Sequence, residues 1–394
     1  MSESGVSTVK PLTIALVAGE SSGDNLGAPL MQSIRRDCPN VRFIGIGGPA
    51  MIAQGLECWT DLDRLSVNGF VDPIKRLPEL IRILISTRNQ ILKADVDCFI
   101  GVDFNFFNLL LERMLKSRGV KTVHYVSPTV WAWRKGRIKS IAKSVDLMLT
   151  LYPFETAIYE QHGISVAFVG HPKADEIDPD GGEVATFAAK EALGLGREDR
   201  VVAILPGSRG SEVKFTGPDF FRAANRIVSS RPDVRFVVPA ANRARRNQIE
   251  ILRAEICGQL DIKVIDGQST LAMQAADVVL VNSGTATLEA MLLKKPMVMS
   301  YRLGWITHWI VSALVTTPYF ALPNILAKRE LIPEFIQDEA TPAALAAAVI
   351  AYLDSPAQVE LIAEFDRIHR RLRRDAGGQA GRAILALIDG EVPR

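Results

Sequence analysis

Residues 13–27, TIALVAGESSGDNLG, decide the fold. A short run of apolar and β-branched residues (13–17) leads directly into a loop of glycine, serine and acidic residues. Residues 30–36 then have helical composition. Because strands that are buried on both faces of a parallel sheet are continuously apolar, this stretch predicts a buried parallel strand, a loop at its carboxyl end and a helix.

The same pattern recurs along most of the chain. Helix-length segments at residues 106–116, 220–229 and 247–257 alternate with short apolar runs. The predicted strands are residues 13–17, 42–46, 98–102, 122–126, 147–151, 166–169, 201–205, 235–238, 263–265, 278–281 and 297–300. Strands that alternate with helices predict an α/β protein with doubly wound sheets.

The alternation breaks once, between about residues 171 and 199, where the chain is rich in proline, glycine and acidic residues. Such composition is typical of a linker. We therefore predict two Rossmann-like domains that face a cleft, residues 1–175 and 176–340. Residues 341–394 have helical composition and are predicted to form C-terminal helices.

Composition excludes several classes of protein. The 394 residues include 46 Lys and Arg against 44 Asp and Glu, and this net charge of +2 does not fit a nucleic-acid-binding protein. The four cysteines form no CxxC pair and the five histidines form no HxH or HxxxH pattern, so neither disulfides nor a metal site is predicted. The N-terminus carries no signal-peptide pattern, and a reducing cytoplasm fits best.

A loop in the second half, LPGSRGSE at residues 205–212, follows a predicted strand. Glycine lets the backbone approach a phosphate closely, and the next helix N-terminus favours negative charge. Arg209 could add a bidentate contact. The alternative is an ordinary turn with a surface arginine, but we favour phosphate binding by Gly207, Ser208 and Arg209.

A second loop of this kind, VNSGTATLE at residues 281–289, also joins a strand to a helix. Its small residues suit a diphosphate at the helix N-terminus, and Glu289 could accept hydrogen bonds from ribose hydroxyls. Two such loops predict a nucleotide in the second half and the other substrate in the first. The candidates are Ser283, Gly284, Thr285, Ala286, Thr287 and Glu289.

Two loops of the first half carry carboxylates. In residues 18–27 the glycines fit neither GxGxxG nor a P-loop, which disfavours a dinucleotide cofactor. This loop either offers a polar surface to a substrate or is a turn capped by Ser22 or Asp24. Asp103 is a lone carboxylate among aromatic residues at a strand exit. It is either a general base or a helix N-cap.

Two segments could contact lipid. In residues 67–84 apolar side chains, including Val67 and Phe70, recur near helical spacing beside basic residues, and two prolines limit any helix to a short one. Arg134 belongs to a basic cluster that follows two tryptophans, a mixture that suits anionic headgroups. Core packing and a solvated charged face are the respective alternatives.

Eight segments, in order from about residue 13 to about 330, resemble the lipid-A-disaccharide synthase family of inverting GT-B glycosyltransferases. They are AGESSGD (18–24), FIGIGG (43–48), GVDFNFFN (101–108), SPTVWAWR (127–134), VGHP (169–172), LPGSR (205–209), SGTATLE (283–289) and LPNILA (322–327). In such enzymes the second domain holds the nucleotide and a terminal helix crosses back, so the resemblance places residues 341–394 partly on the first domain.

The resemblance implies the reaction. The family joins UDP-2,3-diacylglucosamine to 2,3-diacylglucosamine 1-phosphate and releases UDP, forming a β(1→6) disaccharide without a metal or cofactor. It works as a peripheral protein at the cytoplasmic face of the inner membrane. No nucleic acid partner is implied, and a homodimer stays open.

The resemblance also implies residue roles. Asp103 is the candidate base, with Glu20 second, and Asn105 stands where the family has proline. Asn324 would hold a polar group of the donor beside the nucleotide loops. The acceptor and lipid residues would be Ser21, Ser22, Gly23, Asp24, Asn108, Val67, Phe70 and Arg134.

Three other functions fit the same pattern. A UDP-sugar 2-epimerase and a glycosyltransferase with a polyprenyl-linked acceptor would share the architecture. A non-catalytic nucleotide-sugar- or lipid-binding protein would show no UDP release with both substrates present.

Overall fold

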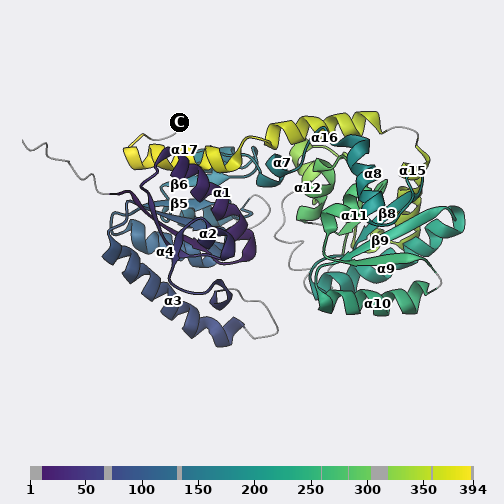
Figure 1. Cartoon of the computed structure of the whole chain (residues 1–394), viewed down its shortest axis with the longest axis horizontal. Coiled ribbons are helices and arrows are strands. Elements are labelled where there is room, and N and C mark those ends of the chain that lie inside the picture. The colour runs from purple at the N-terminus through teal and green to yellow at the C-terminus, as the bar shows by residue number, and fades with distance from the viewer. Residues whose placement is uncertain are drawn as a thin grey trace, which may run out of the picture. The chain divides into compact units, whose positions relative to one another are not determined.

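The computed structural model describes residues 11–65, 73–130, 135–258, 260–282, 284–302, 318–355 and 358–391. The chain divides into two compact units, each with its own parallel sheet (Figure 1). The first unit is Met1–Asp175 with Leu372–Arg394, and the second is Glu176–Arg371.

In the described part of the first unit, the sheet has seven parallel strands in the order β3-β2-β1-β4-β5-β6-β7. Its strands are β1 (Thr13–Ala18), β2 (Arg42–Ile46), β3 (Leu56–Cys58), β4 (Cys98–Val102), β5 (Lys121–Tyr125), β6 (Leu147–Thr150) and β7 (Val166–Phe168). The helices are α1 (Ser21–Asp37), α2 (Pro49–Ala53), η1 (Leu62–Arg64), α3 (Pro73–Ala94), α4 (Asn105–Lys116), η2 (Lys135–Arg137), α5 (Ile138–Ala142), α6 (Thr156–Glu160), α7 (Pro172–Glu176) and α17 (Ala376–Asp389).

Among the residues described in the second unit, the sheet has six parallel strands in the order β10-β9-β8-β11-β12-β13. Its strands are β8 (Arg200–Leu205), β9 (Val234–Ala240), β10 (Ile262–Asp266), β11 (Val278–Asn282), β12 (Met297–Tyr301) and β13 (Glu334–Ile336). The helices are α8 (Gly182–Ala192), α9 (Gly210–Ser230), α10 (Arg243–Cys257), α11 (Ser269–Ala275), α12 (Thr285–Leu292), α14 (Leu322–Ala327), η3 (Gln337–Glu339), α15 (Pro342–Asp354) and α16 (Val359–Leu372).

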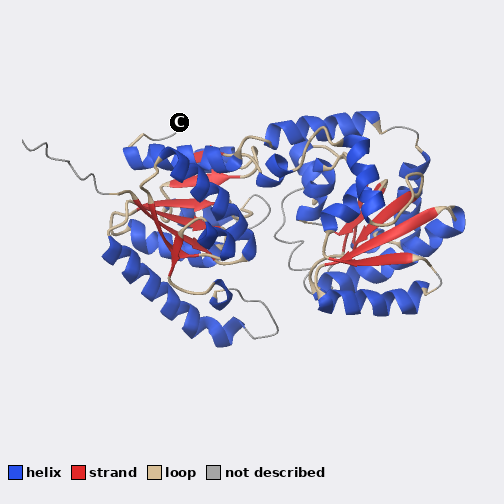
Figure 2. Ribbon diagram, in the orientation of Figure 1, coloured by secondary structure: helices blue, strands red, loops and turns tan. Residues whose placement is uncertain are grey.

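Central strands are buried because helices cover both faces of each sheet (Figure 2). In β1, Ile14 and Leu16 belong to one hydrophobic cluster, whereas Ala15 and Val17 belong to another. Successive side chains of a strand point to opposite faces, so the two clusters are the cores on the two sides of the sheet. This double burial explains the continuously apolar sequence of the strand.

Strand order fixes where a ligand can bind. β1 lies between β2 and β4, and β8 lies between β9 and β11, so the order of the strands reverses beside β1 and beside β8. In doubly wound sheets, ligands bind beyond the carboxyl ends of the strands at such a switch point. The loops after β1 and β4, and those after β8 and β11, are the ones that carry the candidate residues.

Every strand predicted from sequence is present, but β3 and β13 were missed. Each has three residues and lies at an edge of its sheet, which is too short for an apolar run to stand out. The expectation of a short helix in residues 67–84 was wrong, since α3 has 22 residues and contains Pro78. Pro73 occupies its first position, where proline is favoured, and Pro78 removes only one hydrogen bond near the N-terminus.

The last helix, α17, belongs to the first unit and packs against α1. The Lys121 ammonium donates a hydrogen bond to the Leu387 carbonyl at 3.0 Å. Asp175 accepts hydrogen bonds of 2.7–2.9 Å from the backbone N–H groups of Arg374, Asp375 and Ala376. In contrast, α15 packs on α9 in the second unit.

Candidate active site

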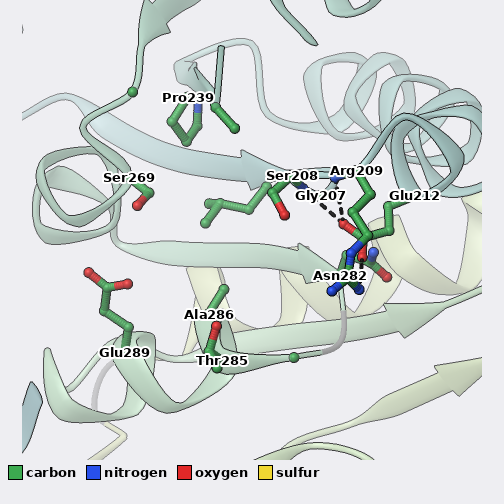
Figure 3. Close-up of a pocket in the computed structure, with 14 residues that line it drawn as sticks. Gly207, Ser208, Arg209, Glu212, Pro239, Ser269, Asn282, Thr285, Ala286 and Glu289 are labelled. Carbon is green, nitrogen blue, oxygen red and sulfur yellow. Dashed lines mark hydrogen bonds and ion pairs between the residues drawn. The ribbon is translucent and has the colours of Figure 1, made fainter. Parts of the chain in front are cut away.

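A pocket of about 430 Å³ lies at the carboxyl edge of the second sheet, at its switch point (Figure 3). Seven predicted donor-site residues line it: Gly207, Ser208, Arg209, Gly284, Thr285, Ala286 and Glu289. The other lining residues are Leu205, Glu212, Pro239, Ala241, Gly267, Ser269 and Asn282. The fold therefore brings the two small-residue loops of the second half together.

Glu212 organises the loop after β8. Its carboxylate accepts hydrogen bonds from the backbone N–H groups of Ser208 and Arg209, at 2.9 and 3.0 Å, and lies 3.3 Å from the Arg209 guanidinium. Gly207 has φ +126°, and a Cβ there would lie 2.4 Å from the Glu212 Cβ. The turn therefore requires glycine, and two of its N–H groups already bind a carboxylate.

The N-terminus of α12 offers free space for an anion. Gly284 precedes the helix, and a Cβ placed on it would meet no atom of the described residues within 4 Å. Thr285 and Ala286 provide the first N–H groups of the helix, which have no partner within a helix and attract negative charge. Ser283 lies outside the described residues.

Thr287 supports this turn instead of lining the pocket. It is fully buried, and its hydroxyl donates to the Gly284 carbonyl at 2.8 Å. The same oxygen accepts the N–H of Leu322 at 3.3 Å.

Glu289 reaches the pocket from the second turn of α12 and accepts a hydrogen bond from the Thr270 hydroxyl. Figure 3 shows Glu289 and Arg209 on opposite sides of the pocket, with Ser269 near Glu289. The pocket thus has a cation at one side and a hydrogen-bond acceptor at the other, which suits a ligand with an anionic and a hydroxylated end.

In the first unit, Asp103 follows β4 at the switch point. It is half-buried, and both it and Phe104 have left-handed backbone conformations, with φ of 52° and 48°. Residues other than glycine seldom adopt this conformation, and it clusters at functional sites. Phe104, not Asp103, is the N-cap of α4, so the structure does not adopt the helix-cap alternative.

Polar neighbours hold Asp103 in place. Its oxygens accept hydrogen bonds from the Ser22 hydroxyl and the Asn105 amide, each at 3.4 Å. Its backbone N–H donates to the Tyr125 carbonyl at 2.8 Å, and its own carbonyl accepts from Asn108 at 2.8 Å. The carboxylate therefore has a defined position beside the loop after β1, where Glu20 and Ser21 are exposed.

Asp24 and Asn108 are committed to protein contacts. Asp24 is buried and accepts three hydrogen bonds of 2.9 Å from the backbone N–H groups of Gly48, Ala50 and Met51, so it caps α2. The Asn108 amide also donates to the Val17 carbonyl at 3.1 Å and thereby joins the ends of β1 and β4. Gly23, in the first turn of α1, is buried.

A family model of lipid-A-disaccharide synthetase matches residues 14–383. The chain belongs to the lipid-A-disaccharide synthase family. A lipid-A-disaccharide synthase from Cellvibrio japonicus is 50% identical over 378 residues, which cover 96% of this chain and 97% of the relative.

Solved structures share the fold. UDP-GlcNAc 2-epimerase from Neisseria meningitidis bound to UDP-GlcNAc has a TM-score of 0.65 at 11% identity, covering 96% of this chain and 100% of that one. The glycotransferase of kitacinnamycin has a TM-score of 0.60 at 17% identity, covering 98% and 100%. These likenesses, with the two parallel sheets, confirm the predicted two-domain α/β fold of the GT-B type, and the family makes the chain a glycosyltransferase of lipid A biosynthesis.

The sequence also assigned three residues to the acceptor and lipid that lie outside the described residues, namely Val67, Phe70 and Arg134. Within the described ranges, no group of three or more His, Cys, Asp or Glu side chains is arranged to hold a metal. In the same ranges no single helix is long and apolar enough to span a membrane. Only when taken together as a bent pair do Pro342–Asp354 and Val359–Asp389 have the required length and apolar composition.

Sequence reasoning missed several of the residues that line the pocket of the second unit. Glu212 and Asn282 were each quoted only as members of a loop, without a role in the site. Pro239 and Ser269 lie at or just after the carboxyl ends of β9 and β10. The rule that ligands bind at the carboxyl edge would have found them had it been applied to every strand of the sheet.

Asn324 does not line the nucleotide-type pocket. It is fully buried, its amide donates to the Ile332 carbonyl at 2.9 Å and to Glu334 at 2.7 Å, and its oxygen accepts the N–H groups of Leu331 and Ile332. All of these partners lie in the segment that leads into β13. Asn324 therefore fixes this segment of the second unit.

We expect Asn324→Ala to lower the free energy of unfolding by about 3 kcal/mol, because it leaves several buried polar groups unpaired. The affinity of the folded protein for UDP should stay within about twofold, and urea unfolding with calorimetry would measure both. Asn247→Ala on the exposed side of α10 is the control. A large loss of UDP affinity without a loss of stability would instead assign Asn324 to the ligand.

Proposed function

We propose that this enzyme transfers 2,3-diacylglucosamine from UDP to the 6-hydroxyl of 2,3-diacylglucosamine 1-phosphate, with inversion and without a metal. The products are the β(1→6) disaccharide 1-phosphate and UDP. The observation that carries the proposal is the pocket at the switch point of the second sheet, where Arg209, the α12 N-terminus and Glu289 converge. Family membership supports the lipid A disaccharide as the product.

The two sides of the pocket suit the two parts of UDP. The N-terminus of α12, at Thr285 and Ala286, and the guanidinium of Arg209 would hold the diphosphate. Glu289 would accept hydrogen bonds from the ribose hydroxyls. In this proposal Asn324 and Thr287 act by fixing the backbone around the pocket, since their polar atoms bind protein partners.

Asp103 would be the general base. As the acceptor oxygen bonds to the anomeric carbon, its proton passes to the Asp103 carboxylate and the bond from that carbon to the UDP oxygen breaks. A single displacement of this kind converts an α-linked donor into a β-linked product. Glu20, exposed before α1, is the second candidate for the base.

The leaving UDP carries developing negative charge. The α12 N-terminus and Arg209 would stabilise it without a metal, because both lie in the pocket before the reaction begins. The Ser208 and Arg209 N–H groups contribute less than the sequence suggested, since Glu212 already accepts them.

The acyl chains and the membrane would meet the first unit at α3 and α4, which pack together. Leu77, Ile81 and Ile85 recur every fourth residue of α3 and are 47%, 46% and 42% exposed. Phe106 of α4 is 77% exposed. Apolar side chains beside the exposed Arg82 suit the surface of an anionic bilayer.

We expect the triple variant Leu77→Ser, Ile81→Ser, Ile85→Ser to bind vesicles of phosphatidylcholine and phosphatidylglycerol at least about 10-fold more weakly in co-sedimentation. Each replaced side chain loses about 1 kcal/mol or more of apolar burial in the bilayer. The control replaces three apolar residues of the second unit by serine, Val184, Ile251 and Val359, which are more exposed than those of α3. Equal losses in both variants would exclude α3 as the docking surface.

Supplying both acylated sugars in detergent tests the reaction. We expect the disaccharide 1-phosphate by mass spectrometry, with one UDP released for each, and no loss of turnover in excess chelator. No UDP release with both sugars present would contradict a transferase, and turnover of UDP-N-acetylglucosamine alone would favour an epimerase. Loss of activity in chelator would overturn the metal-free step.

A further inference from the structure

A buried acid and histidine lie behind Asp103. Glu112 of α4 and His124 of β5 are both fully buried, and Oε1 of Glu112 lies 2.7 Å from Nδ1 of His124. The other ring nitrogen, Nε2, lies 3.0 Å from Oδ1 of Asn105. The Asn105 amide nitrogen in turn donates to Oδ1 of Asp103 at 3.4 Å. A continuous hydrogen-bonded chain thus runs from Glu112 to Asp103.

The hydrogen bonds that link Glu112 to Asp103 have a defined direction. The carboxylate of Asp103 can only accept, so the Asn105 amide presents its NH₂ group to Asp103 and its oxygen to His124. That oxygen can only accept, so Nε2 of His124 carries a hydrogen. Nδ1 then either accepts from a protonated Glu112 or donates to the ionised one, and both states leave the donors that face Asp103 unchanged.

Burying Glu112 and His124 costs free energy, and the neighbouring strand leaves space for the Glu112 carboxyl. Burial raises the pKa of Glu112, while contact with His124 opposes that shift. A Cβ on Gly101 of β4 would lie 2.3 Å from Oε1 of Glu112, so the strand makes room for this carboxyl with glycine. Among the described residues, no protein group hydrogen-bonds Oε2 of Glu112. A buried acid with an unpaired oxygen contributes little to the stability of the fold. Stability therefore does not explain why Glu112 lies behind Asp103.

The backbone at Asp103 needs this support. Asp103 and Phe104 both have positive φ, and strained conformations persist only where the surroundings hold them. Asn105 is the first residue of α4, so its side chain reaches back over the strained pair to both His124 and Asp103.

We propose that Glu112, His124 and Asn105 form a hydrogen-bonded relay that orients the carboxylate of Asp103 for proton removal. Asn105 is the positioning residue of the relay, because it is the member that contacts Asp103. The inference rests on the proposed role of Asp103 as the base. It deepens that role by assigning residues that act only through it.

The test is a double-variant cycle with Asn105→Leu, which keeps the size of the side chain and removes both hydrogen bonds. We expect kcat to fall about 10-fold, with KM for both sugars unchanged within about twofold, because in this proposal the relay acts on the reaction only through Asp103. In an Asp103→Asn background, Asn105→Leu should change the residual kcat by less than about twofold. Asn105→Asp, which places a second carboxylate beside Asp103, should lose more than Asn105→Leu.

The outcomes separate the two proposals. An inactive Asp103→Asn variant with a fully active Asn105→Leu variant overturns the relay alone, and so does an equal loss in both backgrounds. A fully active Asp103→Asn variant overturns the base and the relay together. Thermal unfolding of each variant identifies misfolded protein, and if Asn105→Leu unfolds, Asn105→Ala replaces it in the same cycle.

Discussion

We expect Asp103→Asn to lower kcat by about 10²–10⁴-fold, the usual contribution of a positioned base, and to leave KM for both sugars within about twofold. In the proposed mechanism the acceptor hydroxyl then has no group to take its proton, whereas an asparagine of the same size preserves the contacts that hold the loop. Steady-state turnover of the two acylated sugars in detergent, followed by UDP release, measures both constants.

Two variants accompany Asp103→Asn. Asp37→Asn, at the end of α1, is the control for removing a carboxylate from the first unit and should behave as wild type. Glu20→Gln tests the second candidate for the base. Near-wild-type turnover of Asp103→Asn together with a collapse for Glu20→Gln would transfer the role to Glu20.

The central strands could be predicted because their sequence records burial on both faces. In β1, each of the six residues is buried, so an apolar run was the necessary result of its position. β3 and β13 could not be predicted, since a three-residue edge strand is stabilised by pairing with one neighbour and leaves almost no pattern. The length of α3 was misjudged because Pro73 stands at the first position of the helix, where proline is favoured, and Pro78 removes one hydrogen bond without ending the helix.

The loops of the candidate site could be predicted from one rule, that ligands bind beyond the carboxyl ends of strands. What could not be predicted is which polar groups are already occupied. Asp24 caps a helix that begins 25 residues later, and Asn105 meets a histidine from the next strand. These pairings depend on tertiary packing, and spacing along the chain carries no signal for them.

We expect Arg209→Ala to weaken UDP binding by about 10–100-fold in calorimetry, the effect of losing a charge-assisted hydrogen bond of about 1.5–3 kcal/mol. The side chain is 81% exposed and lies 3.3 Å from Glu212. Its removal would delete a cation and leave the Glu212 carboxylate unneutralised beside the proposed diphosphate site. Because an exposed charge is screened by salt, the difference from wild type should shrink as ionic strength rises.

The control is Arg226→Ala, an exposed arginine of α9 that is not among the residues lining the pocket. Arg209→Lys should recover part of the affinity, since it restores the charge but not a bidentate contact. If UDP binds Arg209→Ala as tightly as wild type at low salt, the diphosphate does not meet Arg209. The N-terminus of α12 would then be the remaining place in this pocket for the negative charge.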